Sequence, residues 1–157
     1  MLYSLHEPHH EELSAARLSK GAQRRLLDRW FGATRWLWNT ALEIRSEAYR
    51  TCGLSFTGND LSRWLTQWKR TAGHEWLGEV PATALTQCLR DQDRAFNHFF
   101  ARRARYPRFK ARPSRQGLRF QDVGASWRSR VLRLPKLGTL RLAAALSCTA
   151  EEGKPSA

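Results

Sequence analysis

Acidic side chains are scarce in this sequence. Only 14 Asp and Glu stand against 27 Lys and Arg, which leaves a formal net charge of +13 and a pI near 11. This imbalance favours a polyanionic partner, with nucleic acid first and an anionic membrane surface second. No run approaches the roughly 18 apolar residues of a membrane-spanning helix. The first 30 residues hold three glutamates and no apolar signal segment. The sequence therefore favours nucleic acid as partner and a cytoplasmic location.

Cysteine is also rare. Cys52, Cys88 and Cys148 are widely spaced and odd in number, and none belongs to a Cys-x-x-Cys pair. This pattern excludes a disulfide framework and a cysteine-based zinc site, and it suits a reducing compartment. We expect no cofactor.

Basic residues are concentrated in one stretch. Between Arg102 and Arg141 the sequence places thirteen Lys and Arg but a single acid, Asp122. Aromatic rings lie among these cations or just before them: Phe99, Phe100, Tyr106, Phe109, Phe120 and Trp127. Cations neutralise phosphates, and flat rings offer stacking surfaces to bases. A solvated basic surface with core aromatics is the alternative, but it would show compensating acids. We predict nucleic-acid backbone contacts from Arg102, Arg103, Arg105, Arg108, Lys110, Arg112, Arg115 and Arg119.

Three segments show the three- and four-residue steps of amphipathic helices. The first should begin at an N-cap, Ser19, and end at a C′ glycine, Gly53. The second follows Thr57-Gly-Asn-Asp60, a capping box with Asp in place of Glu, and should end near Arg70. The third should run from Pro81 to about Arg103 after a loop. Their apolar stripes are Leu27, Trp30, Thr34, Leu37, Trp38, Ala41, Leu42, Arg45 and Ala48; Leu61, Trp64, Leu65 and Trp68; and Leu85, Cys88, Leu89, Gln92, Phe96, Phe99 and Phe100.

The character of the chain changes at Tyr106-Pro107, where prolines and glycines begin to separate short alternating runs. The sequence thus predicts an α+β chain: a helical bundle of about three helices followed by a short antiparallel β module, which is either incomplete or completed by an N-terminal strand. We expect three strands, within 118–123, 131–134 and 139–142. The expected parts are 1–18, a flexible lead-in or a short strand within 13–18; 19–105, the helical module; 106–142, the basic β module; and 143–157, a disordered tail.

Several polar and aromatic residues are given structural roles. The tryptophans at 30, 38, 64 and 68 follow the helical stripes and are expected in the core. Asn39 is expected to bond the backbone of a neighbouring element. Tyr106 and Phe109 either stack on bases or plug the junction between the helices and the β module.

Five segments come in an order and at spacings that resemble the N-terminal part of the OrfB/TnpB proteins of bacterial insertion sequences. They are Phe31-Gly-Ala-Thr-Arg-Trp-Leu-Trp-Asn39, Trp76-Leu-Gly-Glu-Val-Pro81, Asp93-Arg-Ala-Phe-Asn-His-Phe-Phe100, Tyr106-Pro-Arg-Phe-Lys110 and Leu134-Pro-Lys-Leu-Gly138. The resemblance covers about Arg17 to Arg141. Members of this family are transposon-encoded, RNA-guided DNA nucleases.

The resemblance implies a helical recognition lobe, catalogued in part as helix-turn-helix, joined to a wedge-like β module. Together they would bind guide RNA and the duplex DNA motif beside the target. Matching positions for motif reading are Phe56, Thr86 and the region from Gln121 to Gly124, while Ala82 departs from the pattern. Gln87 stands next to Thr86 and is a substitute for it. Phe56 could instead pack as a hydrophobic staple on the second helix.

The family's RuvC-like nuclease domain, with its Asp/Glu/Asp metal site and zinc ribbon, is not matched in this sequence. After Asp122 the acids are Glu151 and Glu152, adjacent in the tail. Neighbouring carboxylates on one loop do not build a two-metal site. We therefore expect a truncated family member that binds DNA and guide-type RNA and is not an enzyme.

Three alternatives remain. The chain could be a decayed reading frame without a role, or a helix-turn-helix regulator of DNA. It could also cut DNA through a tyrosine nucleophile, but Tyr49 and Tyr106 have no histidine pair nearby in the sequence, and Tyr3 lies in the lead-in.

Overall fold

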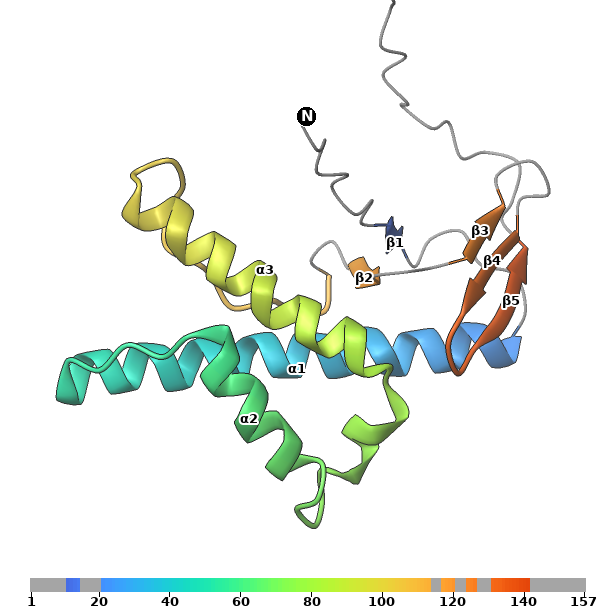
Figure 1. The fold of residues 1–157 in the computed structure, drawn as a ribbon, viewed down its shortest axis with the longest axis horizontal. Coiled ribbons are helices and arrows are strands. Elements are labelled where there is room, and N and C mark those ends of the chain that lie inside the picture. The colour runs from blue at the N-terminus through green and yellow to red at the C-terminus, as the bar shows by residue number, and fades with distance from the viewer. Residues whose placement is uncertain (1–10, 15–20, 114–116, 121–123, 127–130, 142–157) are drawn as a thin grey trace, which may run out of the picture.

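The computed structural model describes residues 11–14, 21–113, 117–120, 124–126 and 131–141 (Figure 1). Within these residues three α-helices precede the main group of short antiparallel strands, which confirms the predicted α+β class. The elements are β1 (Glu11–Ser14), α1 (Gly21–Cys52), α2 (Gly58–Trp68), the 3-10 helix η2 (Glu75–Glu79), α3 (Ala82–Phe100), β2 (Gly117–Phe120), β3 (Gly124–Ser126), β4 (Val131–Leu134) and β5 (Gly138–Arg141).

The first helix, α1, forms the long axis of the molecule, and α3 crosses it (Figure 1). Its predicted apolar stripe is buried from Leu27 to Arg45. The helix ends as predicted at Gly53, whose φ of +65° places it in the left-handed region that glycine adopts without strain. Among the described helices, none combines the length and apolarity needed to cross a membrane. The predicted N-cap, Ser19, lies outside the described residues.

The second helix begins with the capping box that the sequence predicted. The Thr57 backbone N–H and hydroxyl donate to Asp60 Oδ2 at 2.9 and 2.7 Å, and the Asp60 N–H donates back to Thr57 Oγ1. These hydrogen bonds stabilise the ionised carboxylate and lower the pKa of Asp60. The helix ends at Trp68, two residues before the predicted end at Arg70.

The connection to α3 is more ordered than the predicted loop. Residues Glu75–Glu79 form a 3-10 turn. Leu77 within this turn and Val80 just after it are both buried in the core. The third helix then follows Pro81 and ends at Phe100 instead of Arg103. It closes early because Arg102 takes a φ of +57°. The N–H groups of Arg102 and Arg103 bond back to carbonyls in the last helical turn.

The strands form two small antiparallel sheets. β1 pairs with β2, and β3, β4 and β5 form a three-stranded sheet in sequence order. The strands predicted within 131–134 and 139–142 are confirmed within one residue. The strand predicted within 118–123 is present at 117–120, and 121–123 lie outside the described residues. The N-terminal strand does join the β module. However, β1 lies at 11–14 instead of within 13–18. β3, at 124–126, was not predicted, because Gly124-Ala-Ser126 has no alternation of apolar and polar residues.

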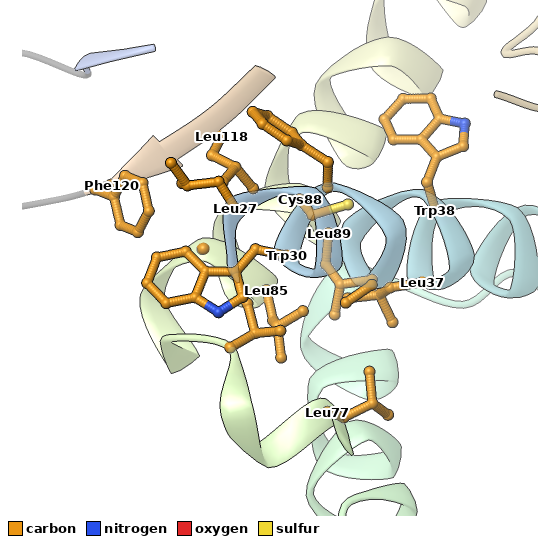
Figure 2. Packing of buried hydrophobic residues seen from close by; sticks show 14 of the residues in the cluster. Leu27, Trp30, Leu37, Trp38, Leu77, Leu85, Cys88, Leu89, Leu118 and Phe120 are labelled. Atoms are coloured by element: carbon orange, nitrogen blue, oxygen red, sulfur yellow. The ribbon is translucent and has the colours of Figure 1, made fainter. Parts of the chain in front are cut away.

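One core joins the helices and the strands. Trp30 is fully buried under Phe120 of β2, with 6.3 Å between ring centroids (Figure 2). Leucines of β4 and β5 belong to the same cluster, and the Gln23 amide of α1 donates to the Thr139 carbonyl of β5. Of the four tryptophans expected in the core, Trp30 and Trp38 are buried; Trp64 and Trp68 are half-buried and pack against it.

Candidate nucleic-acid interface

After α3 the chain turns back and runs along α1 toward β2 (Figure 1). We call residues 102–112 of this stretch the basic segment. Two side chains of α1 hydrogen-bond to the basic segment, one to the Tyr106 side chain and one to the backbone. The Tyr106 hydroxyl hydrogen-bonds Ser46 Oγ at 2.8 Å, and Trp38 Nε1 donates to the Arg108 carbonyl at 2.9 Å. Pro107 between them is buried.

Asn39 holds the basic segment by two hydrogen bonds to the backbone of Lys110. Its Nδ2 donates to the Lys110 carbonyl at 3.0 Å, and its Oδ1 accepts from the Lys110 N–H at 2.8 Å. This confirms the prediction that Asn39 bonds the backbone of a neighbouring element. The Lys110 ammonium lies 4.0 Å from the centroid of the Trp38 ring, a cation–π contact that adds to the attachment.

The fixed backbone leaves the predicted phosphate-binding side chains in solvent. Arg102, Arg103, Arg105 and Arg108 are exposed, and none has an ion pair with another described residue. Lys110 and Arg112 are exposed as well. Because the backbone that carries these cations is already ordered, less conformational freedom is lost when they bind an anion.

Arg119 differs from the other predicted contacts. It is half-buried, and its Nη1 lies 3.2 Å from Asp91 Oδ1 on α3. The expectation that these cations lack compensating acids is therefore wrong at this position, because α3 brings an acid that is distant in the sequence. Arg115 and Gln121 lie outside the described residues.

The third helix presents a polar outer face. Thr86 is half-buried there, whereas Gln87 is 2% exposed and turned inward, so the structure does not support base reading by Gln87. Arg90 and Arg94 follow Thr86 at steps of four, are exposed, and have no ion pair among the described residues. We did not predict these two arginines as contacts, although the helical period complementary to the apolar stripe would have placed them on one face.

Phe56 lies just before α2 and is half-buried. Its ring packs edge-on against Trp64 of α2, with 4.8 Å between centroids. The expected packing of Phe56 on the second helix is therefore present, and its partner there is Trp64. Phe56 also lines a pocket and is half-buried, so this contact leaves part of the residue accessible.

That pocket has a volume of about 580 Å³ and lies between the C-terminal halves of α1 and α3 and the loop between α1 and α2. We call it the aromatic pocket. Its lining is Arg45, Ser46, Tyr49, Leu54, Ser55, Phe56, Thr57, Asp93, Phe96, Asn97, Phe99, Phe100 and Tyr106. Tyr106 is 43% exposed there, so the expected junction role and a stacking role both remain open; Phe109 is 61% exposed.

An ion pair joins the elements around the aromatic pocket. Arg45 Nη2 lies 2.6 Å from Asp93 Oδ1, and both oxygens of Asp93 accept from the Gly58 N–H at the start of α2. A Cβ atom at residue 58 would lie 2.4 Å from Asp93 Oδ2. Gly58 therefore allows one carboxylate to connect α1, α2 and α3.

The described residues show no group of three His, Cys, Asp or Glu side chains placed to hold a metal ion. Cys88 is buried, donates to the Thr34 carbonyl at 3.4 Å, and has its pKa raised to about 12 by burial. Its thiol therefore stays protonated and serves packing.

Comparison with known proteins agrees with this architecture. Residues 20–53 match the OrfB (IS605) helix-turn-helix domain model. The chain is also 34% identical over 122 residues to the protein named "Putative RNA-guided DNA endonuclease InsQ" of Escherichia coli K12. The chain is thus similar to proteins of the OrfB/TnpB family along most of its length. A second relative, described as an RNA-guided DNA endonuclease from Streptomyces pristinaespiralis, is 38% identical over 111 residues.

The alignments with the two relatives cover 77% and 70% of this chain, but 30% and 28% of the relatives themselves. The chain thus spans less than a third of the length of the relatives it matches. The helix-turn-helix match coincides with α1, which is one continuous helix from Gly21 to Cys52.

Proposed function

We propose that the basic segment and the outer face of α3 form one nucleic-acid-binding surface of this chain, with duplex DNA beside a target and a guide-type RNA as its ligands. The observation that carries the proposal is the attachment of the basic segment. Three side chains of α1 fix it, while Arg102, Arg103, Arg105 and Arg108 reach solvent without an acid partner among the described residues. The names of the two relatives, which combine RNA guidance with DNA cleavage, support the choice of ligands.

The parts of this surface would have different tasks. The arginines of the basic segment would contact phosphates and position the polynucleotide without reading its sequence. Thr86 and Phe56 would contact base edges, with Arg90 and Arg94 on the same face of α3 as Thr86. We assign no bond-breaking step to these residues, so the proposed role is binding.

Charge reversal tests the surface. Replacing Arg102, Arg103, Arg105 and Arg108 by Glu should abolish most binding to a structured RNA and to duplex DNA, measured by fluorescence anisotropy across a salt series. Each duplex phosphate contact contributes about 0.9 to the slope of log affinity against log salt, so the slope should fall by about 3–4. Circular dichroism should show an unchanged helical signal, because all four side chains are exposed.

The matched control changes the net charge equally at a different place. Arg24, Arg25, Arg63 and Arg70 are exposed on α1, on α2 and just after α2, and reversing all four should weaken binding much less. Equal losses of affinity in the two variants would show that net charge alone causes the effect, and would refute the assignment of the binding surface to the basic segment. An affinity that does not change with salt concentration for either ligand would also refute this assignment.

A further inference from the structure

The aromatic pocket is an open feature whose lining, apart from Phe56, the proposed surface does not use. We propose that it receives an unpaired base of a single-stranded nucleic acid. This inference rests on the proposed nucleic-acid binding and deepens it, because it assigns a preference for unpaired nucleotides to a particular place. The argument comes from the rings that line the pocket, the polar groups among them, and the charge at its rim.

The rings of the aromatic pocket are both accessible and held in position. Phe100 is 72% exposed, Tyr49 is 69% exposed and Tyr106 is 43% exposed. Tyr106 contacts Phe96 and Phe99 edge-on at 5.6 and 5.2 Å, and its hydroxyl is bonded to Ser46. Large exposed apolar surface of this kind marks a binding site more often than a solvent face. Rings held in place by such contacts offer a ready stacking surface.

A buried cation also lines the pocket. Arg45 is 7% exposed, yet its Nε has no acceptor among the described residues. Its Nη2 pairs with Asp93, and its guanidinium lies 5.2 Å from the centroid of the Phe96 ring. An unsatisfied buried donor is costly, so a ligand that brings an acceptor gains affinity there. The edge of every nucleobase carries such acceptors.

The charge around the pocket selects a polyanion. Arg102 and Arg103 follow Phe100 almost directly, Arg105 precedes Tyr106, and all three are exposed and without an ion pair to described residues. The one acid that lines the pocket, Asp93, is engaged by Arg45 and by the Gly58 N–H. Cations at the rim and rings inside fit a chain of phosphates that carries flat bases. An apolar protein segment would leave these arginines unused.

The size and shape of the pocket favour an unpaired base. Its volume of about 580 Å³ lies in the range of small-molecule sites, roughly 300–1,000 Å³. Bases of a duplex are stacked and paired, and they reach a pocket only when they leave the stack. A duplex therefore contacts the rim arginines with its phosphates, whereas a single strand also fills the pocket.

The test compares exposed rings inside and outside the pocket. Phe100→Ala and Tyr49→Ala remove lining rings, and Trp76→Ala removes a ring that is 37% exposed, lies in η2, and belongs neither to the pocket nor to the proposed surface. Affinities of the 157-residue chain are measured by anisotropy for a single-stranded RNA, the same strand with abasic residues, and a duplex of equal length. Stacking predicts at least about a fivefold loss for each lining variant with the intact single strand. The lining variants should bind the abasic strand and the duplex like the parent chain, and Trp76→Ala should be unchanged with all three.

Each other outcome overturns the proposal. Equal affinity for intact and abasic strands, with a steep salt dependence, would refute the pocket and leave the proposed function standing. Absence of salt-dependent binding to any strand would refute both. If the lining variants convert a dimer to a monomer in sedimentation without changing affinity for the single strand, a second copy of the chain fills the pocket and the proposal is wrong.

Discussion

The two ends of the α1–α3 pair are built from the same kind of apolar stripe but have different surroundings. At one end Leu85 and Leu89 pack on Trp30 and Leu37, and β2 covers them with Leu118 and Phe120 (Figure 2). At the other end the stripe continues through three phenylalanines of α3, but none of the described strands covers it. These rings contact Tyr106 and one another around the aromatic pocket.

The difference shows that a third layer decides whether an apolar stripe becomes core or stays open. Two crossing helices bury one side of each stripe, and a further element must cover the remaining side. The covered end supplies stability, whereas the open end keeps apolar surface available for a ligand. The predictions below test this division, from the largest expected effect to the smallest.

Removing the central ring of the covered end should have the largest effect. Trp30→Ala deletes a side chain that is 0% exposed, and a buried Trp or Phe truncated to Ala costs about 3–5 kcal/mol. Urea unfolding followed by circular dichroism measures the loss. A loss below about 1 kcal/mol would show that the covered end is not the core of the fold.

Breaking the ion pair near the pocket should have the next largest effect. Asp93→Ala leaves Arg45, 7% exposed, without a partner and removes the acceptor of the Gly58 N–H. Losing one partner of a buried pair costs about 3–5 kcal/mol, and the partial exposure of Asp93 reduces our expectation to about 2–3 kcal/mol. The control is Glu47→Ala, which breaks the exposed Glu47–Arg50 pair and should change stability by about 0.5 kcal/mol or less. Equal effects of the two variants would contradict the linking role of Asp93.

The start of α2 should contribute less. Thr57→Ala removes the hydroxyl that accepts from the Asp60 N–H, and loss of such a cap costs about 1 kcal/mol. Thr57→Ser keeps the hydroxyl and should stay close to the parent chain in a thermal melt. A melt in which both variants lose the same stability would assign the effect to the methyl group.

The partner carboxylate in the capping box adds a pH dependence. The pKa of Asp60 is lowered in the folded chain by the hydrogen bonds from Thr57, so its contribution is present above the unfolded value near 3.8. It is lost as pH falls through the lower folded pKa. The difference in Tm between the parent chain and Asp60→Asn should therefore be largest near neutral pH and shrink in acid. A difference that is constant with pH would exclude the charged cap.

Truncation at the open end should have the smallest effect on stability. Phe100→Ala removes a ring that is 72% exposed, and exposed substitutions usually stay within about 0.5 kcal/mol. Leu89→Ala on the same helix, 1% exposed, should cost about 2–5 kcal/mol. Similar urea midpoints for the two variants would remove the distinction between the ends of α3.

Local features of the fold could be predicted because each depends on residues close in the sequence. The capping box needs only Thr57 and Asp60, and the end of α1 needs only a glycine at position 53. The helical stripes could be predicted because the 3.6-residue period alone sets them. The sequence could predict that Asn39 bonds a backbone group, since a polar amide beside a buried stripe needs hydrogen-bond partners. It could not identify the partner, because Lys110 is 71 residues away.

The candidate site was predictable in composition but not in arrangement. The sequence located the arginines of the basic segment, and it could not show that Arg119 pairs with Asp91 or that Gln87 turns inward. Gln87 stands next to Thr86 in the sequence, and one residue rotates a side chain by about 100° around a helix. Which of the two meets solvent depends on where α1 lies.

The sequence by itself determined the helices, their caps, the α+β order and the concentration of positive charge after α3. Periodicity, capping and composition act within a few residues, so the linear chain contains them. Only the tertiary structure decided which part of the α3 stripe became core and which part opened into the aromatic pocket. That outcome depends on β2 covering one end and the basic segment folding back along the other, and both are contacts between residues far apart in the chain.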